Sequence, residues 1–299
     1  MAETSARRKA ALLPDRGVVK VAGEDARVFL HGLVSANILT LAPGTARFGA
    51  LLSPQGKIFA DFIIVEAPPQ AGGGFFLDVP ADLANPLVDK LNLYKLRSRV
   101  IAENLSEVLG VLAAWGGGGT TAIGLAYPDP RLAALGLRVM LPPHRAPDAA
   151  ADLGAVNVDA TEYEAHRIAL AIPRGGADFK YGDAFPHESD MDQLGGVDFA
   201  KGCYVGQEVV SRMEHRGIAR TRVMPIRYRG PAPQPGEPIM SGQRQVGTMG
   251  STSGGHGLAL LRIDRMAEGE PLLAAGIAIE PLKPDWAHFA VPDAVKAAE

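Results

Sequence analysis

The first hundred residues contain several short stretches in which hydrophobic and polar positions alternate. Residues 16–23, RGVVKVAG, alternate as in a strand with one buried face. Residues 48–67 predict two strands around a Pro-Gln-Gly turn, and residues 74–80, GFFLDVP, predict a further strand. The chain therefore begins with strands that lie close together in sequence.

Other stretches have their apolar residues at helical spacing. This spacing occurs over residues 23–38 and 81–96, and again over 163–176, where Pro173 and Gly175 end the predicted helix. Strands and helices mix without a regular β-α-β alternation. The pattern thus predicts an α+β fold and argues against a doubly wound sheet.

Glycine- and proline-rich segments separate these elements. Residues 66–74, 115–121 and 141–150 are predicted as loops, because runs of Gly and Pro hold neither a helix nor a ladder of strand hydrogen bonds. The segment 115–121, WGGGGTT, lacks the Gly-Lys-Ser/Thr ending of a phosphate-binding loop. It is therefore interpreted as a connection and not as a nucleotide site.

The pattern changes after residue 220 to short strand-like runs split by Gly and Pro. Such a pattern is typical of a small β-barrel or sandwich of roughly 75 residues. We place the boundary between residues 218 and 222, which gives a first domain over 1–218 and a C-terminal barrel domain over 219–299.

Composition restricts the function. The chain has 299 residues, 47% of them hydrophobic, and a formal charge of only −3, so no overall basic field favours nucleic acid or an anionic membrane. No apolar run approaches the roughly 20 residues that span a bilayer. The N-terminal stretch 1–17 lacks the apolar region and cleavage site of a secretory signal. We therefore expect a cytoplasmic protein without direct nucleic-acid or membrane partners.

Cys203 is the only cysteine, which excludes an intramolecular disulfide and a zinc site built from cysteines. Apolar residues at 209, 210 and 213 predict a helix from Gln207, so Cys203 would precede a helix N-terminus. There, backbone N–H groups and Lys201 favour a thiolate. The alternative is a buried and inert cysteine, as free cysteines commonly are.

Charged residues gather on both sides of this segment. The acidic segment 185–194, FPHESDMDQL, lacks the spacing of a calcium loop and the paired histidines of a zinc helix, so we expect no metal site there. A basic group follows the cysteine and suits a carboxylate or phosphate, or alternatively forms ordinary ion pairs on a solvated helix: Arg212, His215, Arg216, Arg220 and Arg222.

The segment KGCYVGQE, residues 201–208, resembles the signature of the YgfZ family of folate-binding proteins, relatives of the glycine cleavage T-protein. RIALAIPRGG, FPHESDMDQLGGVDF and QVGTMGSTS occur in the family's order around it, and the resemblance covers about residues 15–290. It implies a T-protein-like ring of interlocked α+β subdomains around a folate cavity, with a C-terminal β-barrel.

The same resemblance implies a tetrahydrofolate-binding accessory factor for the assembly or repair of iron–sulfur clusters. The clients would mainly be [4Fe–4S] proteins, and in some family members tRNA-modifying radical enzymes. The implied cofactor is tetrahydrofolate or a one-carbon derivative, with no stably bound metal, and the implied partners are iron–sulfur carrier or client proteins. The alternative function is a folate-dependent aminomethyl or one-carbon transferase of the T-protein type.

Residue roles also follow from the resemblance. Cys203 would be the functional thiol, with Lys201 as its neighbour, and Glu188 would hold the pterin because a carboxylate accepts two adjacent N–H groups. Where the T-protein has two aspartates this chain has Ala60 and Asp61, which disfavours aminomethyl transfer. The folate-binding residues predicted besides Glu188 are Asp61, Arg97, Tyr204, Gln207, Glu208 and Arg212.

Overall fold

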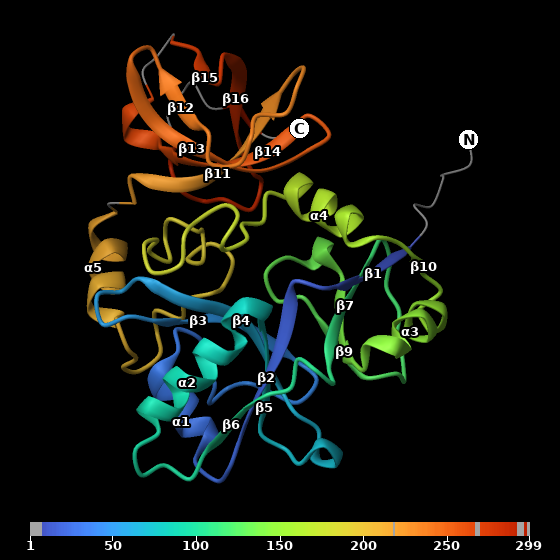
Figure 1. Cartoon of the computed structure of the whole chain (residues 1–299). Coiled ribbons are helices and arrows are strands. Elements are labelled where there is room, and N and C mark those ends of the chain that lie inside the picture. Colours follow the sequence, from blue (N-terminus) through green and yellow to red (C-terminus); the bar gives the residue numbers. More distant parts are fainter. Residues whose placement is uncertain (1–7, 218, 267–269, 292–295, 298–299) are drawn as a thin grey trace. The chain divides into compact units, whose positions relative to one another are not determined.

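The computed structural model describes residues 8–217, 219–266, 270–291 and 296–297 (Figure 1). Part of the N-terminal stretch in which we searched for a signal, and residue 218 at the predicted domain boundary, lie outside these residues. The chain forms two compact units. Unit 1 comprises Met1–Leu52, Ala60–Tyr163 and Gly195–Val205, and unit 2 comprises Ser53–Phe59, Glu164–Leu194 and Gly206–Glu299. These units combine segments that are distant in the sequence, whereas our predicted boundary at residue 218 divides the chain into two continuous domains. That boundary stays a prediction.

Two five-stranded sheets form the framework of unit 1. One has the order β3-β4-β5-β2-β6, and the other has the order β10-β1-β7-β9-β8. The strands of the first sheet are β2 (Arg16–Ala22), β3 (Ala46–Leu52), β4 (Ile58–Glu66), β5 (Phe75–Pro80) and β6 (Ile101–Asn104). The strands of the second sheet are β1 (Lys9–Leu13), β7 (Gly110–Trp115), β8 (Leu125–Pro128), β9 (Leu137–Leu141) and β10 (Val156–Asn157).

Helices α1 (Ala26–Leu33), α2 (Ala84–Tyr94) and α3 (Ala146–Asp152) complete unit 1, and α4 (Ala160–Ala169) begins there. Helix α3 packs small side chains against the second sheet, in a cluster that includes Leu112, Val139 and Leu141. Our prediction of a loop over residues 141–150 is wrong in its second half, where α3 begins. Pro147 lies in the first turn of this helix, where its missing N–H has no intrahelical partner to lose.

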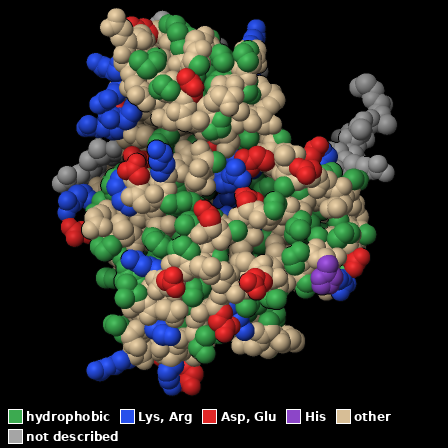
Figure 2. Space-filling model, in the orientation of Figure 1, with side chains coloured by type: hydrophobic (Ala, Val, Ile, Leu, Met, Phe, Trp, Pro, Cys, Tyr) green, Lys and Arg blue, Asp and Glu red, His purple; other side chains and the backbone are tan. Residues whose placement is uncertain are grey.

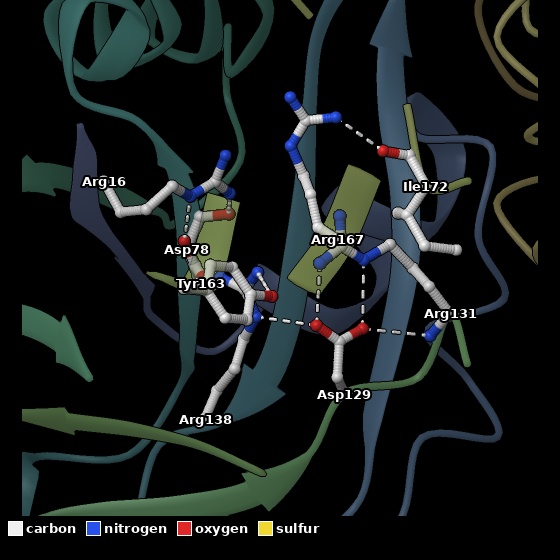
Figure 3. A network of polar contacts seen from close by, with 8 residues as sticks. All are labelled: Arg16, Asp78, Asp129, Arg131, Arg138, Tyr163, Arg167 and Ile172. Atoms are coloured by element: carbon white, nitrogen blue, oxygen red, sulfur yellow. Dashed lines mark hydrogen bonds and ion pairs between the residues drawn. The ribbon is translucent and has the colours of Figure 1, made fainter. Parts of the chain in front are cut away.

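A buried ion-pair network joins the two sheets of unit 1 (Figure 3). The Arg138 guanidinium on β9 donates to Asp78 Oδ2 on β5 at 2.5 Å, to Asp129 Oδ2 at 2.8 Å and to the Tyr163 hydroxyl at 3.0 Å. Arg16 binds the other oxygen of Asp78. Burial alone would raise the pKa of the Asp78 carboxyl, but Arg16 and Arg138 outweigh it and lower this pKa below its ordinary value.

Unit 2 contains the closed C-terminal barrel (Figure 1, orange to red). Its strands are β11 (Thr221–Tyr228), β12 (Pro238–Ser241), β13 (Arg244–Ser253), β14 (His256–Arg262), β15 (Leu272–Ala274) and β16 (Ile277–Lys283). β11 closes the barrel because it pairs with both β14 and β16. A two-residue turn, Gly254–Gly255, joins β13 to β14, and its two positive φ angles of 56° and 84° favour glycine. A short strand, β17 (Lys296–Ala297), pairs with β16 in parallel.

Besides the barrel, unit 2 contains residues 53–59, the C-terminal part of α4, helix α5 and a long irregular segment. Helix α5 (Gln207–Arg216) begins where the sequence predicted and ends at Gly217. Helix α4 begins and ends earlier than the predicted helix over 163–176. The α+β class and the C-terminal barrel are both confirmed, whereas residues 171–194 form turns that no periodicity indicated.

The described surface carries charges of both signs. Figure 2 shows acidic and basic side chains interspersed among hydrophobic ones over the face that it presents, in keeping with the formal charge of −3. Among the described residues, no helix is both long enough and apolar enough to cross a membrane.

The sheet-joining network yields a stability prediction. Replacing Arg138 by Met removes three buried hydrogen bonds and leaves Asp78 and Asp129 with fewer donors, so we expect a loss of about 3 kcal/mol or more in the free energy of unfolding. Urea unfolding followed by circular dichroism measures it. Arg145→Met is the matched control, because Arg145 pairs with Asp148 in solvent and is expected to cost less than about 1 kcal/mol. Equal losses for the two variants would contradict the prediction.

Candidate functional site

Cys203 lies in an exposed loop of unit 1, ahead of α5. The Asp198 carboxylate turns this loop by accepting the N–H groups of Ala200 at 2.9 Å and Lys201 at 3.0 Å. The Asp198 N–H in turn donates to the Ser35 carbonyl at 3.0 Å. The predicted place ahead of a helix is confirmed, and the alternative of a buried cysteine is wrong.

Lys201 anchors the loop from inside unit 1. Its ammonium donates to the carbonyls of His31 at 2.6 Å, Val34 at 2.5 Å and Ala36 at 3.0 Å, and the side chain is 7% exposed. Two of these carbonyls lie in the last turn of α1 or just beyond it, where the helix leaves its carbonyls without partners and favours a cation. All three N–H donors of the ammonium are therefore used on the backbone. We expected a neighbour that assists the thiol, whereas the structure gives Lys201 a positioning contact.

Burial sets the protonation of this group. It lowers the pKa of the Lys201 amine to about 8, against a smaller opposing effect of Asp198. The Tyr204 ring lies 5.0 Å from the Lys201 Nζ, and the Tyr204 hydroxyl is buried without a hydrogen-bond partner in the described part of the chain. Burial raises the pKa of this hydroxyl to about 12. Tyr204 therefore packs on the anchor as a neutral ring.

His31 lies beside the cysteine loop. A Cβ added to Gly202 would lie 4.0 Å from the His31 Nε2, and burial and Lys201 lower the pKa of this imidazole below its ordinary value. The sequence analysis assigned His31 no role. The sequence around His31 does not indicate that it lies near residue 202. The two positions meet because of tertiary contacts, the turn at Asp198 and the ammonium of Lys201.

A pocket of about 600 Å³ lies within unit 2. Such a volume is within the roughly 300–1,000 Å³ of small-molecule sites. Irregular residues 176–188, Lys57 and barrel residues form its wall. The polar side chains of the lining are Lys57, Asp178, Lys180, Asp183, Glu188 and Thr248, and its large apolar ones are Phe179, Met249 and Leu260.

Glu188 is the predicted residue that the pocket contains. Its Oε2 accepts the Phe185 N–H at 2.9 Å, and its own carbonyl accepts the Val223 N–H of β11 at 2.8 Å. Lys57 lies 3.5 Å from the centre of the Phe185 ring. Burial raises the pKa of the Glu188 carboxyl above its ordinary value, while the Phe185 N–H and Lys57 oppose this shift. The carboxylate is thus fixed at the wall with acceptor capacity left.

Buried ion pairs hold the irregular wall against the barrel. Arg167 donates to Asp178 Oδ2 at 2.7 Å and to the Ser251 hydroxyl at 2.6 Å. Asp178 Oδ1 accepts the Ser251 N–H at 2.8 Å. Figure 3 shows the neighbouring contact from Arg167 to the Ile172 carbonyl, which fixes the residues after α4. One wall of the pocket is therefore barrel sheet, and the other is an irregular segment that buried charges hold in place.

The other predicted residues lie outside this pocket. Asp61 is 7% exposed in β4, and Arg97 is exposed in the turn after α2. Glu208 and Arg212 form an exposed ion pair at 2.7 Å on α5, and Gln207 is the first residue of that helix. Within unit 2, sequence reasoning missed Lys57, Lys180 and Asp183, which only the fold brings beside Glu188.

The acidic segment contains one group with the residue types of a metal site. Ligand atoms of His187, Asp192 and Glu214 lie within 4.8 Å of one another. However, Arg222 binds both oxygens of Asp192 at 2.9 and 2.8 Å, and His187 Nε2 lies 3.0 Å from Glu214 Oε2. His187 and Glu214 thus contact each other, and Asp192 is bound by Arg222. The positive charge of the Arg222 guanidinium would repel a metal cation. The absence of a metal site stays a prediction.

Comparison with known proteins first identifies the fold. The glycine cleavage system aminomethyltransferase T from Bartonella henselae superposes with a TM-score of 0.73 over 96% of this chain and 88% of its own, at 15% identity. A family model described as the CAF17 C-terminal beta-barrel domain matches residues 220–289. The chain is therefore a T-protein-like α+β protein with a C-terminal barrel.

Sequence relatives then give the family. The human iron-sulfur cluster assembly factor IBA57, mitochondrial, is 32% identical over 92% of this chain and 84% of its own length. A homologue from Mycosarcoma maydis is 35% identical over 76% of this chain. The chain belongs to the IBA57 family of iron–sulfur cluster assembly factors, which is related to the YgfZ family that the sequence resembles. It spans 54–61% of the length of the five fungal relatives compared first.

The relatives also overturn one expectation. The human, mouse and fungal proteins are all named mitochondrial, so our prediction of a cytoplasmic protein is wrong and the finding points to the mitochondrion. The criterion that we applied detects the apolar region of a secretory signal. Mitochondrial presequences are amphipathic and rich in arginine, so this criterion does not register them.

The Lys201 anchor yields a prediction on stability and pH. Lys201→Met leaves three carbonyls without their donor, and we expect a loss of about 2–4 kcal/mol in the free energy of unfolding near pH 7. The folded-state pKa of about 8 lies below the ordinary 10.5, so the unfolded chain binds more protons between these values. The stability of the wild type relative to Lys201→Met should therefore rise from pH 8 to 10.5.

Urea unfolding of both proteins across this pH range measures the effect. Lys9→Met serves as the matched control, since Lys9 forms an exposed pair with Glu162 in the same unit and should change stability by less than about 1 kcal/mol. A Lys201→Met variant as stable as Lys9→Met would show that the anchor is unimportant.

Proposed function

We propose that this protein helps to assemble iron–sulfur clusters through Cys203, whose thiolate binds a cluster in transit. The observation that most directly supports this proposal is that the thiol is exposed, in a loop whose backbone is fixed by a buried lysine. The family gives independent support, since the relatives are named assembly factors. A mobile loop would pay an ordering cost each time that a cluster bound, whereas a fixed loop presents its thiol without that cost.

Ligand counting requires a partner. An all-cysteine cluster takes four thiolates, and this chain has one cysteine. The cluster is therefore substrate, held jointly with an iron–sulfur carrier and released to a client protein. Clients that hold [4Fe–4S] clusters, including tRNA-modifying radical enzymes, belong to the same proposal.

Folate binding is the second part of the proposal. The pocket of unit 2 has the size for a folate, and the Glu188 carboxylate at its wall suits the N–H and amino donors of a pterin. Lys57 and Lys180 offer positive charge for the carboxylates of the glutamate tail. When bound, tetrahydrofolate would supply a one-carbon carrier or a reductant. The chain's own contribution is to orient the ring through Glu188.

No particular observation favours aminomethyl transfer over this proposal. The likeness to the T-protein stands at 15% identity and concerns the fold. Ala60 occupies the first position of the aspartate pair, and Asp61 is 7% exposed. We therefore do not extend the proposal to this activity.

Folate binding is tested by calorimetry with tetrahydrofolate under anaerobic conditions. Glu188→Gln keeps the size of the side chain and exchanges one acceptor for a donor, so we expect binding at least about tenfold weaker than in the wild type. Because the pKa of Glu188 is raised, wild-type binding should also weaken as the pH falls toward that pKa. Glu162→Gln is the matched control, because Glu162 is exposed beside Lys9 in unit 1 and does not line the pocket, so this variant should bind as the wild type does. Absence of binding to the wild type would remove the folate part of the proposal.

The thiol is tested in cells that lack the gene. Cys203→Ser changes one exposed atom, so we expect unfolding within about 0.5 kcal/mol of the wild type but loss of [4Fe–4S] enzyme activity. The activity of a [4Fe–4S] dehydratase, compared with that of a cluster-free enzyme in the same extract, measures this. A Cys203→Ser protein that restores full activity would refute the role of the thiol.

A further inference from the structure

The pocket of unit 2 has three carboxylates in its lining, and they differ in what already binds them. The two oxygens of Asp178 accept Arg167 and the Ser251 N–H, so this carboxylate serves the structure. Glu188 accepts one N–H through its Oε2. The Asp183 carboxylate forms no hydrogen bond or ion pair with any residue that the structure describes, so both of its oxygens remain for a ligand.

The backbone on both sides of Asp183 is fixed. The Gly182 N–H donates to the Ile58 carbonyl at 2.7 Å, and the Ile58 N–H donates to the Ala184 carbonyl at 2.9 Å. Gly182 has a positive φ of 77° in a turn that the Asp183 N–H closes on the Lys180 carbonyl at 3.3 Å. Asp183 is an exposed residue, but it lines the pocket from a turn that is held on both flanks.

The lysines of the pocket do not neutralise this carboxylate by direct contact. Lys57 lies over the Phe185 ring, 3.5 Å from its centre, and Lys180 forms no ion pair with a described residue. Burial raises the pKa of the Glu188 carboxyl, and the negative charge of Asp183 adds to this rise. The two carboxylates are thus near enough to interact, and one small ligand in the pocket can meet both.

A pterin ring carries two sets of donors that carboxylates can bind. The N3–H and the 2-amino group are present in every folate, and they suit Glu188. N8 carries a hydrogen in dihydrofolate and tetrahydrofolate, whereas in folic acid it has a lone pair and no hydrogen. Because an ionised carboxylate only accepts hydrogen bonds, it attracts the reduced forms at N8 and repels the oxidised form.

We propose that Asp183 accepts the N8 hydrogen of a bound pterin and makes the pocket selective for dihydrofolate and tetrahydrofolate over folic acid. This inference rests on the folate part of the proposed function and adds the residue that selects the oxidation state. The contacts to Glu188 and Asp183 leave N5 and N10 unbound, and these are the atoms on which tetrahydrofolate carries one-carbon groups.

N8 suits Asp183 better than N5 does. The C4 carbonyl oxygen of a pterin projects between the N3–H and N5, and it would repel a second carboxylate placed beside Glu188 on that side. On the other side of the ring no oxygen projects between the 2-amino group and N8. Thr248 also lines the pocket, but its hydroxyl both donates and accepts, so it does not distinguish the two forms. Selection therefore falls to a group that only accepts.

Calorimetry under anaerobic conditions tests this inference with three ligands that share one glutamate tail: tetrahydrofolate, 7,8-dihydrofolate and folic acid. The wild type should bind the first two within about threefold of each other and folic acid at least about tenfold more weakly, because a charge-assisted hydrogen bond is replaced by a repulsion. Asp183→Asn keeps the size of the side chain, and its amide can accept the N8 hydrogen or donate to the N8 lone pair. This variant should bind folic acid more tightly than the wild type does, so that the preference falls below about threefold.

Asp285→Asn is the matched control, because Asp285 is exposed in unit 2 and does not line the pocket. It should keep the wild-type preference. Circular dichroism shows whether each variant is folded. Asp183→Ser provides a second variant if Asp183→Asn unfolds, and it should lose the preference as well, since a hydroxyl both donates and accepts.

Equal binding of all three ligands by the wild type, or a preference that Asp183→Asn retains, would overturn the role of Asp183 and leave the folate part of the proposed function standing. Binding of dihydrofolate as weak as that of folic acid would show that the pocket senses N5, which also contradicts the inference. If the wild type binds none of the three ligands, the inference and the folate part of the proposed function both fail.

Discussion

The buried ammonium of Lys201 is the constraint on which the candidate cysteine site depends. It binds three carbonyls between residues 31 and 36, at distances from 2.5 to 3.0 Å. The same segment covers the free edge of β3, where Ser35 N–H and the Ser35 hydroxyl bind Ala50. One cation therefore binds the carbonyls at the end of α1, holds the segment that covers a sheet edge, and fixes the backbone two residues before Cys203. Arginine would not replace it easily, because its planar fork does not match three converging acceptors.

The sequence predicted those features that local rules determine. The alternation over 16–23 and 48–67, the helix that begins at Gln207 and the barrel after residue 220 all follow from periodicity and from Gly and Pro, and the structure confirms them. The place of the thiol ahead of a helix follows from the apolar spacing at 209, 210 and 213. The loop at 141–150 was wrong because Pro147 was weighed as a breaker, although the first turn of a helix tolerates it.

Contacts between distant segments were not predictable from the sequence. Lys201 was noticed for its charge beside the thiol, but its partners lie about 170 positions earlier in the chain. Asp78 gave a signal that was overlooked, since a lone carboxylate in the apolar strand FFLDVP needs a buried partner. The partners, Arg16 and Arg138, come from other strands. The pocket around Glu188 has the same origin in part: charges and turns that no periodic pattern marks build its irregular wall, and the fold sets this wall against β13 and β14.

Under the proposed function, an exposed thiol on a buried anchor is how one cysteine would serve a passing cluster. A chain with all four thiolates would retain its cluster, whereas one thiolate holds it only while a partner supplies the rest. A single thiolate binds a cluster weakly, so the bound state is short-lived. The thiolate must therefore already be in position, because a mobile loop would lose further affinity in becoming ordered. Lys201 meets this demand from below the surface, because its buried ammonium binds three backbone carbonyls and fixes the loop that bears Cys203. The fixed loop and the single thiolate would thus both serve the proposed transfer of a cluster.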